Sequence, residues 1–123
     1  MNKEQALHAF WSSFGIPAYD EQTVPDNAKM PYITYRVVTD SFENTVNLTG
    51  SIWYRSTSWV DVSNKSAEIA KAVGEHGFRM SKVNGGYLWI VKGTPFAQRM
   101  SDPEDDMIRR IYINLQGEFL TAY

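Results

Sequence analysis

The sequence contains no cysteine and only two histidines, His8 and His76. The absence of thiols excludes a disulfide framework, a thiolate metal site and a cysteine nucleophile, and it fits a reducing compartment such as a cytoplasm. His8 falls on the polar side of a predicted helix, and His76 falls near the end of another, where the helix dipole favours an imidazole. We interpret both histidines as surface or capping residues.

Long hydrophobic runs and an excess of basic charge are also absent. Charges interrupt the first twenty residues, and no stretch reaches the about eighteen apolar residues that a membrane-spanning helix needs. Twelve Lys and Arg stand against fourteen Asp and Glu, and the basic residues are scattered. We therefore expect a single soluble domain over residues 1–123, with no signal peptide, no membrane association and no tight binding to nucleic acid.

Motifs for catalysis or cofactor binding are missing. Gly85-Gly86 lacks a following Lys-Ser/Thr and leads into a predicted strand, so it indicates a turn and not a phosphate cradle. The acidic stretch from Asp102 to Asp106 lacks the spacing of a calcium loop, which favours a solvated charge run or a contact with basic groups of a partner. We expect no enzymatic activity, no cofactor and no metal.

Hydrophobic periodicity predicts two helices. The first runs from Lys3 to Phe14 and is stopped by Gly15, and the second begins at Ser58 and exits at Gly74 and Gly77. Residues 16–30 contain two prolines and show no hydrophobic periodicity, which predicts a long surface loop.

Alternating segments predict the strands. Two of them, residues 32–40 and 45–56, should pair as a hairpin through residues 40–44, and residues 78–92 should form a second hairpin around Asn84-Gly85. Residues 93–106 are predicted to be irregular, and a long last strand from Met107 should be interrupted or bent at Gly117. The fold class is α+β: a mainly antiparallel sheet of about four to five strands, packed on one face by an N-terminal helix and one central helix.

Aromatic residues make up 14% of the sequence, with four Trp, which is more than a core of this size readily buries. Alternation places Trp53 on the opposite face of the sheet from its neighbour Ile52, and Arg110 on the opposite face from its neighbour Ile111. Two readings remain open: this face is uncovered and available for an oligomer, or a helix covers it and Trp53 belongs to the core.

The whole order of elements resembles the small tail-terminator, or tail-completion, proteins of long-tailed bacteriophages. The resemblance rests on an N-terminal helix, a loop into Pro31-Tyr32-Ile33-Thr34-Tyr35, a strand, a helix, a hairpin and the closing strand from Arg110 to Leu115. It implies a virion subunit, made in the host cytoplasm, that forms a homo-oligomeric ring, typically hexameric, at the head-proximal end of the tail tube. Such a ring ends tube polymerisation, docks the connector or stopper protein of the head, and lets DNA pass without specific binding.

The resemblance carries no catalytic residues, so the predicted contacts come from strand alternation and charge. Two alternatives remain: a head-completion or stopper protein of the neck, and a ligand-binding or enzymatic domain with Trp53, Tyr54 and Trp89 around a pocket. For subunit contacts we predict Trp53, Arg55, Arg109, Arg110 and Tyr112, and for contacts with other virion proteins Asp20, Glu21, Glu104, Asp105 and Asp106.

Overall fold

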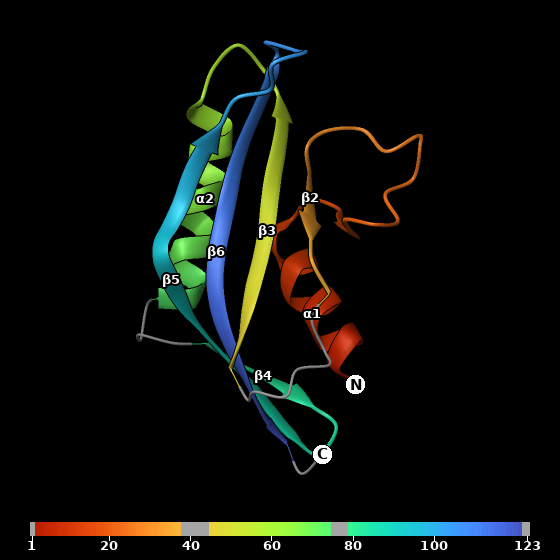
Figure 1. Ribbon diagram of the computed structural model, residues 1–123, viewed down its shortest axis with the longest axis vertical. Coiled ribbons are helices and arrows are strands. Elements are labelled where there is room, and N and C mark those ends of the chain that lie inside the picture. The colour runs from red at the N-terminus through yellow and green to blue at the C-terminus, as the bar shows by residue number, and fades with distance from the viewer. Residues whose placement is uncertain (1, 38–44, 75–78, 122–123) are drawn as a thin grey trace.

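The computed structural model describes residues 2–37, 45–74 and 79–121, which form one sheet and two helices (Figure 1). The strand order is β1-β2-β3-β6-β5-β4, and every pairing is antiparallel except that of β1 with β2. This confirms the α+β class with a mainly antiparallel sheet and two helices. The elements are α1 (Lys3–Trp11), the 3-10 turn η1 (Ser12–Phe14), β1 (Ala18–Asp20), β2 (Tyr32–Tyr35), β3 (Thr45–Arg55), α2 (Val60–Gly74), β4 (Arg79–Val83), β5 (Gly86–Met100) and β6 (Ile108–Thr121).

The first helix begins at a capping box. The Asn2 side chain accepts the Gln5 amide at 2.8 Å, and the Gln5 side chain accepts the Asn2 amide at 3.0 Å, so two helix-terminal amides gain partners. Helix α1 and η1 together cover the predicted segment, and Gly15 ends it in the left-handed conformation, with φ of 81°. Its predicted apolar stripe is buried: Leu7, Phe10, Trp11 and Phe14.

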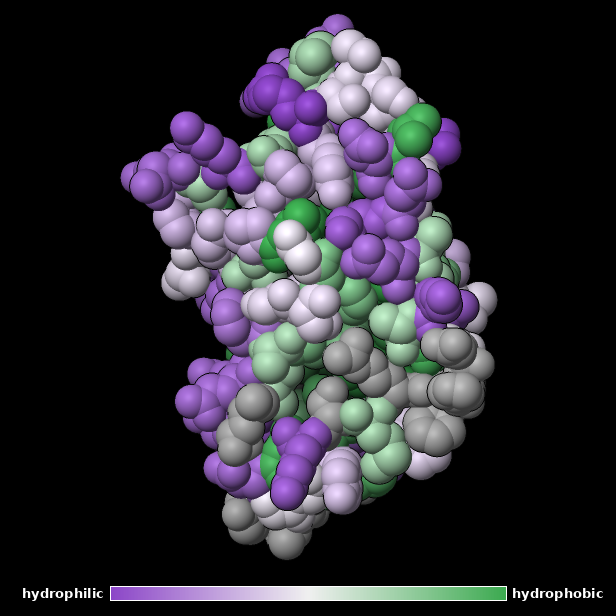
Figure 2. Space-filling view, turned by 180° about the vertical axis from the view of Figure 1, so that it is seen from behind, coloured by the Kyte–Doolittle hydropathy of each residue, from purple (hydrophilic) through white to green (hydrophobic). Residues whose placement is uncertain are grey.

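Both helices pack against the same face of the sheet. Val62, Ile69 and Val73 of α2 are fully buried in the core that α1 and the sheet share. The Lys65 ammonium group donates to the Phe14 carbonyl at 2.6 Å and so joins α2 to the end of η1. Viewed from this side, hydrophilic residues dominate the margins and hydrophobic residues show in the middle (Figure 2). Within the part of the chain that the structure describes, neither helix covers the opposite face, which we call the open face.

The long ladder between β3 and β6 fixes which residues face the helices. It pairs Thr45 with Glu118 at one end and Arg55 with Ile108 at the other. Pairing continues through Gly117, so the predicted interruption there is wrong. A side chain at Gly117 would place its Cβ 2.6 Å from Leu48 Cδ1, so this glycine allows close packing in the core.

Six strands form, and not four to five, because the predicted loop over residues 16–30 contains β1. Three residues are too few for alternation to reveal, and β1 is defined by its parallel pairing with β2, in which Ala18 lies beside Ile33. The predicted irregular stretch is also partly wrong, because β5 continues to Met100 after a register shift between Lys92 and Ala97. The register shift interrupts the alternation of inward-facing and outward-facing residues, so the sequence pattern does not indicate that the strand continues.

The two predicted hairpins had different outcomes. Strands β2 and β3 do pair, but β2 ends at Tyr35. The turn over residues 40–44, together with His76 and Gly77, lies outside the described residues. The hairpin of β4 and β5 is confirmed: Val83 pairs with Gly86, and Gly85 has φ of 82°. Asn84 does not have a positive φ, so only the glycine takes the left-handed conformation.

The close approach of Trp11 to β3 gives a test of the core. A Cβ at Gly50 would lie 3.0 Å from both Trp11 Cη2 and the Thr34 carbonyl oxygen, and neither the buried ring nor the backbone can move freely. We expect Gly50→Ala to lower the free energy of unfolding by about 1–3 kcal/mol, as overpacking does. Urea denaturation measures this. Gln116→Ala, at an exposed site on β6, is the control and should change stability by no more than about 0.5 kcal/mol. An unchanged midpoint for Gly50→Ala would contradict this packing.

Candidate protein-interaction surface

The open face carries a row of large side chains that crosses four strands. Tyr32 of β2 pairs with Trp53 of β3, which pairs with Arg110 of β6, which pairs with Met100 of β5. Directly opposite residues in a sheet point to the same side, so these four side chains lie next to each other. We call this set the aromatic row. It resolves the two readings of Trp53, which is half-buried on the open face and not part of the helix-covered core.

The aromatic row continues toward the sheet edge through ring contacts. The Tyr19 and Tyr32 rings lie 5.8 Å apart between centroids, and the Tyr32 and Trp53 rings lie 6.4 Å apart. The Arg110 guanidinium lies 4.6 Å from the centre of the Trp53 ring. These distances are typical of edge-to-face aromatic pairs and of cation–π contacts.

A second row of polar side chains holds the aromatic row in place. Trp53 Nε1 donates to Thr34 Oγ1 at 2.8 Å, and Arg110 Nε donates to Ser51 Oγ at 2.9 Å. Thr34 and Ser51 pair with each other, and the row goes on to Tyr112. Trp53 and Arg110 are thus fixed before any partner arrives, which reduces the conformational entropy lost on binding.

The acidic turn between β5 and β6 lies beside this surface. Trp53 and Arg110 line a hollow of about 220 Å³ together with Ser101, Asp102, Pro103 and Glu104. The turn is shaped by the Glu104 amide, which donates to Asp102 Oδ1 at 2.9 Å. The fold therefore brings together two residues predicted for subunit contacts, Trp53 and Arg110, and one predicted for contacts with other proteins, Glu104.

Arg55 and Asp105 contact each other within the chain. Arg55 Nη2 donates to Asp105 Oδ2 at 2.8 Å, and the Met107 amide donates to Asp105 Oδ1 at 2.9 Å. The Met107 amide first, and Arg55 second, hold the pKa of Asp105 below its ordinary value. This pair ties the acidic turn to the end of β3. Asp106, next to it, is exposed.

Arg109 lies on the helix-covered face and not in the aromatic row. Its guanidinium donates to the backbone carbonyls of Asp106, Ile108 and Thr57, and it lies 5.5 Å from the centre of the Trp59 ring. These contacts tie the start of β6 to the segment before α2. A role of Arg109 in subunit contacts remains a prediction.

Asp20 and Glu21 lie where β1 ends. Asp20 Oδ1 accepts the Gln22 amide at 3.0 Å and shapes the turn, and Glu21 pairs with Arg36 at 3.1 Å on the exposed surface. They belong to the β1 edge, whereas the acidic turn follows β5. Their contact with another protein remains a prediction.

A second surface lies at the opposite end of the open face, where β4, β5 and the end of β6 form an arm. Cross-strand pairing there gives one row of Lys82, Tyr87 and Leu120 and another of Met80, Trp89 and Glu118. We call these six residues the arm surface. Of these six residues, the sequence pattern indicated only Trp89, as part of the pocket in the ligand-binding alternative. Alternation was visible in the hairpin, but the alignment of these residues with the last strand depends on a register that the sequence does not show.

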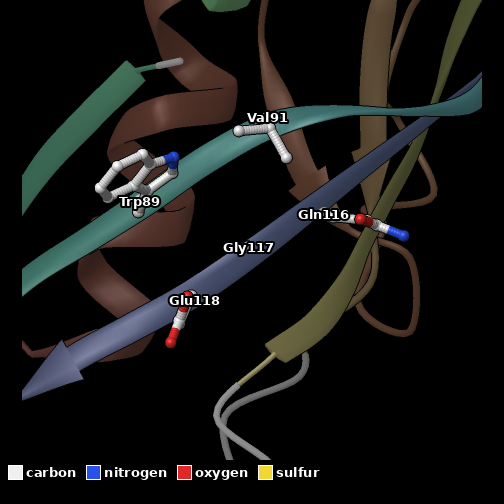
Figure 3. Close-up of a pocket in the computed structure, with 5 residues that line it drawn as sticks. All are labelled: Trp89, Val91, Gln116, Gly117 and Glu118. Atoms are coloured by element: carbon white, nitrogen blue, oxygen red, sulfur yellow. The ribbon is translucent and has the colours of Figure 1, made fainter. Parts of the chain in front are cut away.

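The arm surface borders a second hollow. Trp89 and Val91 of β5 and Gln116 and Glu118 of β6 surround about 190 Å³, with Gly117 between the two β6 side chains (Figure 3). Trp53 and Trp89 therefore line different hollows, and Tyr54 packs against the helix-covered core. The pocket of Trp53, Tyr54 and Trp89 that the ligand-binding alternative requires does not form.

His8 is exposed, as predicted, and contacts the Tyr35 hydroxyl at 3.0 Å and Ser12 Oγ at 3.2 Å. Among the described residues, no group of three or more histidine and carboxylate side chains is arranged to hold a metal ion. The helices in this part of the chain are too short or too polar to cross a membrane.

The fold also occurs in a gene transfer agent particle and in a bacteriophage protein. It matches a chain in the virion of a native gene transfer agent (GTA) particle, with a TM-score of 0.62 and 14% identity over 95% of this chain and 93% of that one. It also matches the gp17 protein of bacteriophage SPP1, with a TM-score of 0.51 and 12% identity over 94% and 87% of the two chains. At these identities the comparison shows a shared fold. No family model and no curated protein matches the sequence.

The lowered pKa of Asp105 predicts a pH-dependent contribution to stability. Because the folded state favours the carboxylate, this contribution is complete above the ordinary pKa of 3.8 and is lost as the pH falls from there through the lower folded-state pKa. We expect the unfolding free energy of the wild type to decrease over that interval more steeply than that of Asp105→Asn, as measured by urea denaturation at a series of pH values. Parallel curves for the two proteins would show that Asp105 makes no such contribution.

Proposed function

We propose that the chain is a structural virion protein that forms a hexameric ring at the head-proximal end of a phage tail tube. The ring ends tube polymerisation and offers a docking surface to the connector or stopper protein of the head. The observation that carries this proposal is the aromatic row: a prearranged, uncovered surface of Tyr, Trp and Arg on a fold shared with phage and phage-like particles.

Termination requires a closed ring with two different faces. A head-to-tail contact between identical subunits produces either an endless filament or, when the rotation closes, a ring. One face of the ring binds the tube, and the other face presents a surface that the tube protein does not bind, so no further layer is added. Such a protein works through binding alone, so it acts without catalysis and needs no cofactor.

The charge balance of the chain suits a channel that DNA crosses. Twelve Lys and Arg stand against fourteen Asp and Glu, and the basic residues are scattered along the sequence. A basic lumen would hold the phosphate backbone through counterion release, whereas a mixed surface allows the nucleic acid to slide. A ring whose lumen proved to be lined mainly by Lys and Arg would contradict this part of the proposal.

Tail tubes purified from a strain that makes no filled heads provide the test of this proposal. We expect the purified chain to have a concentration-dependent oligomeric mass by light scattering, and electron microscopy with a labelled chain to show it at one end of each tube. Adding the chain during tube assembly should also limit tube length. A chain that stays monomeric with tubes present would overturn the proposal, and a chain that binds only filled heads would identify it as the head-completion or stopper protein.

A further inference from the structure

Exposed hydrophobic side chains gather at the two ends of the sheet. The described chain exposes seven large hydrophobic residues, and four of them lie on the arm surface: Met80 (42%), Tyr87 (47%), Trp89 (37%) and Leu120 (40%). The other three, Val60, Met100 and Met107, belong to the opposite end, where β5 ends and α2 and β6 begin (Figure 1). Concentrated hydrophobic exposure of this kind marks interaction surfaces.

The two ends carry complementary charges. The aromatic row presents Arg110 beside the carboxylates of Asp102 and Glu104, whereas the arm surface presents Glu118 in one row and Lys82 in the other. Each end therefore combines a cation, an acidic group and exposed hydrophobic side chains. Arg110 and Glu118 project from the same face of β6 and are separated by about 27 Å, the length of eight residues of extended chain. Since the sheet joins them rigidly, they cannot meet within one copy.

We propose that the arm surface of one copy binds the aromatic row and acidic turn of the next copy. This inference rests on the proposed function, because it names the contact that would build the ring. In this contact Arg110 pairs with Glu118 of the neighbour, and Lys82 of the neighbour pairs with Asp102 and Glu104. The hydrophobic side chains of the two surfaces pack around these pairs.

Arg110 is suited to this contact. The hydrogen bond to Ser51 uses Nε, so within the described residues both terminal amino groups remain for a carboxylate of a neighbour. The hollow on the arm surface is bordered by Glu118, whose carboxylate is the kind of group that attracts a guanidinium. The two surfaces differ and lie apart, so every copy can use both at once, and a head-to-tail arrangement of these contacts builds the proposed ring.

Charge reversal tests this contact. In Arg110→Glu two acidic groups face each other in every contact, and in Glu118→Arg two basic groups do, so each variant alone should assemble at least about tenfold more weakly than the wild type. An equal mixture of the two variants should recover assembly when their copies alternate. At one contact Arg110 and Glu118 meet as in the wild type, and at the next contact the introduced glutamate meets the introduced arginine. Native mass spectrometry should find the two variants in equal numbers within each oligomer. The double variant R110E/E118R should assemble on its own.

The controls distinguish a loss of the folded structure from a loss of the contact between copies. Lys71→Glu, an exposed charge reversal on α2, should assemble like the wild type, and circular dichroism should show that every variant is folded. If the single variants assemble like the wild type, or if the mixture fails to recover, the proposed contact is wrong although the ring function can stand. If the wild type itself neither assembles nor binds tubes, the proposed function fails as well.

Discussion

The pairing of β3 with β6 is the constraint on which the rest of the structure depends. Over the whole of β3 it directs Leu48, Ile52 and their partners on β6 toward the helices. The same pairing sends Trp53 and Arg110 to the other side. Because α1 and α2 both pack on the first face, the second keeps its large side chains uncovered in the described chain. The core and the candidate interaction surface are thus two consequences of one register.

The open face is ordered by hydrogen bonds that a purely hydrophobic surface would lack. Thr34 and Ser51 each hold one member of the aromatic row, so Trp53 and Arg110 keep their geometry while remaining accessible. Arg55 and Arg109 act differently: they bind Asp105 and backbone carbonyls and brace the turns at the same end. Arginines of similar appearance in the sequence therefore make different contacts: Arg55 projects from the same face as Arg110 but binds Asp105, whereas Arg109 projects from the helix-covered face.

Local patterns in the sequence predicted the helices and most strands well, because α1, α2 and β6 each bury one regular stripe. What they could not predict depends on distant pairing. Strand β1 exists only because β2 lies beside it, and Met100 joins the aromatic row only after a register shift within β5. The arm surface was missed for the same reason: Trp89 and Glu118 are neighbours by register and are far apart in sequence. The position of Trp53 and Arg110 on the face away from the core was predicted correctly, because simple alternation places them there, and their role in subunit contacts stays a prediction.

The register shift within β5 lies between the two surfaces, since Tyr87 and Trp89 precede it and Met100 follows it. A bulge of this kind bends a strand and increases its twist. In the proposed head-to-tail assembly, the angle between neighbouring subunits would depend on the angle between the two ends of one subunit. The bend at residues 93–96 would therefore contribute to the circumference of the ring.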